Sequence, residues 1–166
     1  MMNATKNVTA TFDAPPGEKL WLRQLGASGS EQSNAVAVDS TGDVIVTGSF
    51  SGTLDFGGGI MATSSGNDIF VAKFAKADGA TLWAKTFGAS GGDRGYGVVV
   101  DGDDNVLVVG SLSGTVSFGA TSVTASASDL FVVKLAAADG APIWAKSFGG
   151  DANDQASAVA VDSSDN

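Results

Sequence analysis

Short valine-rich runs, separated by glycine and aspartate turns, organise the chain and show no helical periodicity. Such runs predict β-strands, here at residues 20–25, 34–38, 43–50 and 68–75, with a shorter stretch at 53–56. The segment 39–42 begins with Asp and ends with Gly, which is typical of a turn, and residues 77–80 turn the chain back again. The pattern therefore predicts an antiparallel meander.

The same pattern recurs along the chain. Trp21, Trp83 and Trp144 head similar stretches, LWLRQLG, LWAKTFG and IWAKSFG, at spacings of 62 and 61 residues. The run AVAVDSTGDVIVTGSFSG from Ala35 matches GVVVDGDDNVLVVGSLSG from Gly97 at the same offset. A repeat of this density defines a tandem architecture in which each unit packs against its neighbours.

Four short antiparallel strands per unit predict an all-β fold of β-propeller blades. A β-solenoid would have a shorter period, and a β-sandwich would not normally repeat its sequence, so we prefer the propeller. Inner strands of stacked blades are apolar on both faces, and aromatic residues fill the wedge between blades. We therefore expect two buried sets, the valines Val36, Val38, Val44 and Val46 and the aromatics Trp21, Phe56 and Phe70.

The repeat divides the chain into two full units, residues 20–81 and 82–142, and a truncated third unit, residues 143–166. Residues 1–19 differ, and we interpret them as the end of an upstream domain followed by a Pro/Gly linker. A closed propeller has about 4–8 blades. We therefore expect an incomplete ring, completed by further blades of the same chain or by other copies.

Composition excludes several classes of function. The formal net charge is −9, with 18 acidic residues against 9 basic ones, which disfavours binding to nucleic acid. The chain has no His and no Cys, so it lacks His-based catalytic triads, disulfides and thiolate metal sites. No apolar run is long enough to predict a membrane span. No residue is assigned a catalytic or cofactor-binding role.

One candidate site is a calcium loop. Asp101, Asp103 and Asn105 place oxygen-bearing side chains at positions i, i+2 and i+4, the opening spacing of an oxygen-ligand calcium loop. Val106 follows where a glycine is expected, and no glutamate occurs downstream. The alternative is a hairpin turn in which Asp101 accepts hydrogen bonds from local backbone N–H groups.

Two other features have structural interpretations. The glycine-rich stretch 92–97 leads into a strand, whereas a dinucleotide-binding loop must open a helix. Lys73 and Lys134 lie within predicted strands, near Asp68 and Asp129 in sequence, and we interpret them as members of ion pairs rather than nucleophiles.

The repeated motifs resemble those of bacterial SBBP-type β-propeller repeats. The matching segments are WAKTFG at 83–88, AVDSTGDVIVTG at 37–48, SGTLDFGG at 51–58, DIFVAK at 68–73 and DG at 78–79. The resemblance covers residues 20–166 and implies a large propeller in a secreted or cell-surface protein. Within residues 1–13, the segment 3–12 resembles the last strand of an internalin-type or immunoglobulin-like surface repeat.

These observations favour a non-enzymatic extracellular or cell-surface scaffold that binds a protein or glycan ligand through its loops. The alternative is the scaffold of a secreted enzyme whose catalytic residues lie outside these 166 residues.

Overall fold

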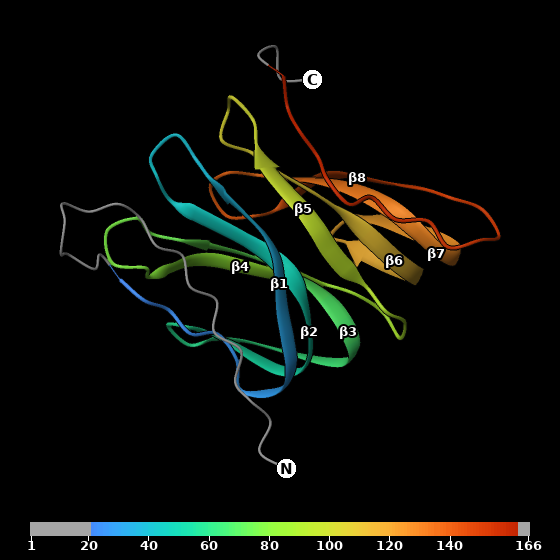
Figure 1. Ribbon diagram of the computed structural model, residues 1–166, viewed down its shortest axis with the longest axis horizontal. Helices are drawn as coiled ribbons and strands as arrows, with labels where there is room; N and C mark the ends of the chain where they lie inside the picture. Colours follow the sequence, from blue (N-terminus) through green and yellow to red (C-terminus); the bar gives the residue numbers. More distant parts are fainter. Residues whose placement is uncertain (1–20, 163–166) are drawn as a thin grey trace.

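The computed structural model describes residues 21–162, which form two four-stranded sheets (Figure 1). In both sheets consecutive strands are antiparallel neighbours, with the orders β1-β2-β3-β4 and β5-β6-β7-β8. The strands are β1 (Ser28–Val38), β2 (Val44–Gly57), β3 (Ile60–Phe74), β4 (Thr81–Phe87), β5 (Arg94–Val100), β6 (Val106–Phe118), β7 (Thr121–Leu135) and β8 (Pro142–Phe148). The predicted all-β fold with propeller-type blades is confirmed, and no helix that could cross a membrane occurs in the described range.

The strands are longer than the sequence pattern predicted. β1 begins at Ser28 rather than at residue 34, and β2 continues through the short stretch 53–56. The β2–β3 hairpin keeps pairing through this stretch, for example between Leu54 and Ala62, and Leu54 and Phe56 are buried there. In this extension buried apolar residues alternate with more exposed polar ones, so it forms part of the core. The strand predicted at 20–25 is absent from residues 21–25.

Each tryptophan strand completes the sheet that precedes it. Trp83 on β4 pairs with Lys73 on β3, and Trp144 on β8 pairs with Lys134 on β7. The sequence units were drawn from the tryptophan strand onward, so they are offset from the sheets by one strand. Residues 1–20, which include the proposed upstream domain, and residues 163–166 lie outside the described range.

The two sheets pack face to face around one core. Ile45, Ile69 and Val71 of the first sheet are fully buried in a cluster that also contains most of the apolar residues of the second sheet. The rings of Phe87 on β4 and Phe118 on β6 lie 4.8 Å apart between their centroids. Sheet–sheet burial of this kind is how neighbouring propeller blades are held together.

A second core covers the opposite face of the first sheet. Phe56 and Phe70 are buried there, and Trp21 packs against them. The three predicted aromatics thus meet, as expected, but on the outer face of the first sheet. Their counterparts in the repeat, Trp83, Phe118 and Phe131, lie in the core between the two sheets.

The burial prediction was wrong for two of the four valines. Val44 and Val46 are buried, whereas Val36 and Val38 have exposed fractions of 58% and 47%. Val36 and Val38 lie on the side of β1 that faces away from the second sheet. Val98, the counterpart of Val36 in the next unit, is only 6% exposed because β5 packs beside β1 (Figure 1).

The repeated glycine of the inner strands is required by close backbone approach. At Gly48 a Cβ atom would collide with the backbone oxygen of Gln32, and at Gly110 it would collide with that of Arg94. Both oxygens belong to the neighbouring inner strand, next to a register shift. Only glycine fits between strands that approach so closely.

Candidate functional site

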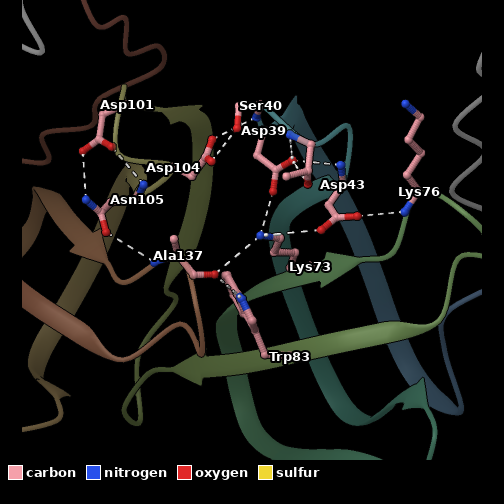
Figure 2. A network of polar contacts seen from close by, with 11 residues as sticks. Asp39, Ser40, Asp43, Lys73, Lys76, Trp83, Asp101, Asp104, Asn105 and Ala137 are labelled. Carbon is pink, nitrogen blue, oxygen red and sulfur yellow. Dashed lines mark hydrogen bonds and ion pairs between the residues drawn. The ribbon is translucent and has the colours of Figure 1, made fainter.

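The turns of the two blades meet at one end of the sheets. In the first blade, residues 39–43 connect β1 to β2 and residues 75–80 connect β3 to β4. These turns lie side by side because Val44, which opens β2, pairs with Phe74, which closes β3. The same arrangement recurs in the second blade, and we call this end of the molecule the turn face (Figure 2).

A buried aspartate organises the turn at the end of β1. The Oδ1 atom of Asp39 accepts hydrogen bonds from the backbone N–H groups of Thr41 and Asp43 and from the Thr41 hydroxyl, at 2.8–2.9 Å. Its Oδ2 atom lies 2.7 Å from the Nζ atom of Lys73 on β3. Both side chains are nearly inaccessible to solvent, at 1% for Asp39 and 11% for Lys73.

These bonds fix the charge of Asp39. Burial alone would raise the pKa of its carboxyl group, because it disfavours the ionised form. The hydrogen bonds from Lys73, Thr41 and Asp43 outweigh burial and lower the pKa from 3.8 to about 2. Asp39 is therefore ionised over the whole range from mild acid upward.

The second blade repeats the arrangement. Asp101 Oδ1 accepts the N–H groups of Asp103 and Asn105 at 3.0 and 2.9 Å, and Oδ2 lies 2.7 Å from Lys134 Nζ. Burial opposes ionisation here too, but the bonds from Lys134, Asn105 and Asp103 outweigh it and lower the pKa of Asp101. The two blades thus carry the same buried aspartate–lysine pair.

The sequence predicted ion pairs for Lys73 and Lys134, but with different aspartates as partners. Lys73 pairs with Asp39 instead of Asp68. Lys134 likewise pairs with Asp101 instead of Asp129. In each case the lysine lies five positions after the aspartate on its own strand, and an odd offset places the two side chains on opposite faces of a sheet. The true partner comes from the turn after the innermost strand, which the repeat marks with an aspartate in every unit.

Side chains on the turn face also join the two blades. Ser40 donates its backbone N–H and its hydroxyl to the carboxylate of Asp104, at 2.9 and 2.6 Å. Lys73 Nζ and Trp83 Nε1 both donate to the backbone oxygen of Ala137, at 3.5 and 3.2 Å (Figure 2). These contacts set the position of one blade's turns against those of the next.

Asp104 was missed by sequence reasoning. Its backbone has φ = 63°, a left-handed conformation that is uncommon for residues other than glycine, and Gly42 holds the equivalent position in the first blade with φ = 90°. Aspartate is among the side chains that tolerate this region. An aspartate that replaces the glycine of a repeat was the available signal, and it marks the contact with Ser40.

The proposed calcium ligands are engaged by the protein itself. Both oxygens of Asp101 are occupied, Asn105 Oδ1 accepts the backbone N–H of Ala137 at 3.3 Å, and Asp103 is exposed. Within residues 21–162, no group of three or more His, Cys, Asp or Glu is arranged to hold a metal. The geometry is that of the hairpin-turn alternative, and the calcium site stays a prediction without support from this arrangement.

A further buried carboxylate lies toward the other end of the sheets. Asp93, which is fully buried, accepts the N–H of Ala89 at 2.9 Å and that of Ser113 on β6 at 2.7 Å. It thereby ties the segment that connects the two sheets to the second blade. Burial raises the pKa of Asp93, these hydrogen bonds offset the rise in part, and the nearby Asp68 carboxylate adds to it.

In residues 21–162, the polar groups of the turn face are bonded mainly to one another. The lysine ammonium groups are held by carboxylates, and the Ser40 hydroxyl is bonded to a carboxylate that lies in an exposed turn. A nucleophilic serine needs a general base positioned to take its proton while its oxygen faces a substrate. What the geometry provides is a rigid base beneath four exposed turns.

Comparison with known proteins supports the class of fold. The chain is similar to an uncharacterised WD repeat-containing protein of Acanthamoeba polyphaga mimivirus, with 29% identity over 109 residues. The match covers 60% of this chain and 8% of that protein, so the chain spans a small part of its relative. No family model matches, and the resemblance to SBBP-type repeats stays a prediction. WD repeats form four-stranded propeller blades. The sheets and this similarity together define a β-propeller-type repeat protein.

Proposed function

We propose that the chain is a non-enzymatic β-propeller-type scaffold that binds a protein partner through its turn face. The observation that carries the proposal is that the two blades hold their turns by equivalent buried aspartate–lysine pairs, while the exposed residues at the tips of those turns differ. The buried pairs Asp39–Lys73 and Asp101–Lys134 hold the turns in the same way, at 2.7 Å in both blades.

The tips above this frame differ in sequence and are largely exposed. The β1–β2 turn carries Ser-Thr-Gly at residues 40–42, whereas the β5–β6 turn carries Gly-Asp-Asp at 102–104. The β3–β4 turn carries Lys-Ala-Asp at 76–78, and the β7–β8 turn carries Ala-Ala-Asp at 137–139. Loops that vary on a constant scaffold are where repeat proteins place recognition.

The charge of the tips indicates the chemistry of the partner. Asp78, Asp103 and Asp139 are exposed at this end of the blades, and the whole chain has a net charge of −9. We expect a partner with a basic surface, whose association is steered by charge and weakens with salt. The mimivirus relative, a WD repeat-containing protein, belongs to a class of scaffold folds and so supports a binding role.

The test uses a variant that neutralises the tips without disturbing the turns. Asp78 and Asp139 each accept a backbone N–H through Oδ1, from Ala80 and Ala141. Asparagine keeps that oxygen, so the triple variant D78N/D103N/D139N should fold like the wild type. The matched control is Asp151→Asn, which removes an exposed charge beyond the other end of β8.

Proteins captured from the source cells and their medium by the immobilised chain are identified by mass spectrometry. The affinity of each is then measured for the three forms at two salt concentrations. A protein that loses affinity for the triple variant and keeps it for the control supports the proposal. Equal affinity for all three forms, selective capture of glycans, or turnover of a substrate by the chain would contradict it.

The resemblance to SBBP-type repeats supports a place outside the cell or at its surface. Fractionation of cells that express the natural gene, followed by immunoblotting, tests this part of the proposal. Recovery of the protein only from the cytosol would contradict the location and leave the binding test unaffected.

A further inference from the structure

The outer face of the second sheet leaves apolar side chains in solvent that the first sheet buries at equivalent positions. Trp83 and Phe87 on β4 are 5% and 7% exposed, whereas Trp144 and Phe148 on β8 are 36% and 54% exposed. The two β4 residues are covered by the second sheet. The two β8 residues belong to the same repeat pattern but meet no further blade in the described range.

The contacts of Trp83 show what kind of surface fits this face. Its indole N–H donates to the backbone oxygen of Ala137, and its ring lies over Gly140, where a Cβ atom would come within 2.7 Å of the ring. Both groups belong to the β7–β8 turn of the next blade. A surface that covers Trp144 in the same way is therefore a blade with a small residue at this turn and a backbone carbonyl that can accept an indole N–H.

The first sheet of this chain has such a surface. Trp21 donates its indole N–H to the backbone oxygen of Lys76 at 2.9 Å, and its ring lies over Gly79. Lys76 and Gly79 are the repeat equivalents of Ala137 and Gly140. Residues 21–26 thus occupy, on the first sheet, the place that a tryptophan strand of a preceding blade would fill. On the same face of the sheet, at the β1 edge, Val36 remains 58% exposed.

The other end of the chain has a comparable role. The N–H of Asp154 donates to the backbone oxygen of Ser128 at 2.6 Å, as the N–H of Asp93 donates to that of Asn67 at 2.8 Å. Residues 153–162 run beside β5, in the position that β1 of a further blade would take (Figure 1). They form no strand in the described range, so this end covers only part of the face.

We propose that a second copy of the chain docks head to tail on the outer face of the second sheet. The first sheet of the second copy packs on the second sheet of the first copy. This contact repeats the one that β5–β8 makes with β1–β4 within each chain. Trp144 takes the place of Trp21 on Gly79 of the second copy, and the β1 strand that carries Val36 takes the place of residues 153–162. The contact is heterologous, so association continues from copy to copy unless a ring closes.

Sedimentation velocity over a range of protein concentrations tests this proposal. The wild type should grow beyond a dimer as concentration rises. Trp144→Ala and Phe148→Ser should each weaken association by about tenfold or more, because both remove aromatic area from the contact. Ile143→Ser is the matched control, since Ile143 and its counterpart Leu82 are about half exposed in both blades, at 51% and 49%.

Trp21→Ala should have the opposite effect and strengthen association, because it vacates the place that Trp144 takes. Non-specific association through exposed apolar side chains would not be strengthened by Trp21→Ala. Circular dichroism and urea unfolding check that every variant folds. If Trp144→Ala does not fold, Phe148→Ser tests the same contact in its place.

Mixing two variants gives the sharpest outcome. Trp144→Ala weakens the docking surface on the outer face of the second sheet. Val36→Asp places a charge on the docking surface of the first sheet. At a concentration where the wild type associates, each variant alone should be mainly monomeric, whereas an equimolar mixture should form a heterodimer and grow no further. A wild type that stays monomeric at all concentrations overturns the proposal. So does a closed dimer that persists in both single variants, or association that Ile143→Ser abolishes equally.

Discussion

The buried pair between Asp39 and Lys73 makes the stability of the protein depend on pH in a way that one substitution isolates. The unfolded-state pKa of an aspartate is about 3.9, and the pKa of Asp39 in the folded protein is about 2. A carboxyl group whose pKa is lower in the folded state stabilises it above the unfolded value. That contribution is lost as the pH falls from about 4 toward 2.

The size of the effect follows from the two pKa values. One pKa unit corresponds to about 1.4 kcal/mol, so lowering the pKa of Asp39 from 3.8 to about 2 contributes roughly 2 kcal/mol at neutral pH. Asp39→Asn keeps an oxygen for the N–H groups of Thr41 and Asp43 but removes the charge opposite Lys73. We expect the variant to lose roughly 2 kcal/mol at pH 7 and almost nothing near pH 2.

Urea unfolding of the wild type and Asp39→Asn, from pH 7 down to pH 2, measures this difference. Other carboxyl groups titrate in both proteins and cancel in the comparison, including Asp93, whose raised pKa acts in the opposite sense. Asp43→Asn is the control, because its carboxylate is 3.8 Å from Lys73 and more exposed, so we expect a loss below about 1 kcal/mol. A difference for Asp39→Asn that is the same at pH 7 and near pH 2 would refute the reasoning.

Three further predictions follow from packing and ligation. Trp83→Ala should destabilise the chain by about 3–5 kcal/mol in urea unfolding, and Trp144→Ala by much less in the monomer, since only Trp83 is buried between the sheets. Gly110→Ala should destabilise more than Gly150→Ala, because a Cβ at Gly110 meets backbone whereas at Gly150 it meets open space, and thermal unfolding ranks the two. Calcium should leave the melting temperature unchanged, because Lys134 already pairs with Asp101; a calcium-dependent rise would restore the metal site.

The sequence repeat predicted the architecture because each unit repeats the same turn and strand chemistry. Asp39 and Asp101 mark the same turn, and the glycines at 48 and 110 mark the same close approach of inner strands. A residue that recurs with its local structure can be recognised without coordinates. The strand ends could not be placed in this way, because glycine and polar residues such as Ser51, Gly52 and Thr53 interrupt the apolar pattern while backbone pairing continues through them.

The sequence could not show which of two neighbouring sheets each tryptophan strand joins. A strand between two sheets has the same apolar pattern whether it closes one sheet or opens the next. Strand pairing decides the matter, since Trp83 pairs with Lys73 behind it and is covered by the blade ahead. The exposure of Val36 has the same origin, because burial in a stacked repeat depends on a neighbour and not on the residue itself.

The contact between Ser40 and Asp104 shows that the blades are not interchangeable. The repeat places Gly102 in the second blade where the first has Ser40, and Gly42 in the first blade where the second has Asp104. The hydroxyl–carboxylate bond at 2.6 Å therefore belongs to the junction between these two blades, in this order. A head-to-tail contact between copies would bring Gly102 to Gly42 and lack this side-chain bond. Since a hydrogen bond to a charged group contributes about 1.5–3 kcal/mol, the junction within the chain should be the stronger of the two. Introducing the bond between copies, by Gly102→Ser together with Gly42→Asp, should then strengthen their association, and a pair of substitutions without effect would contradict the proposed register.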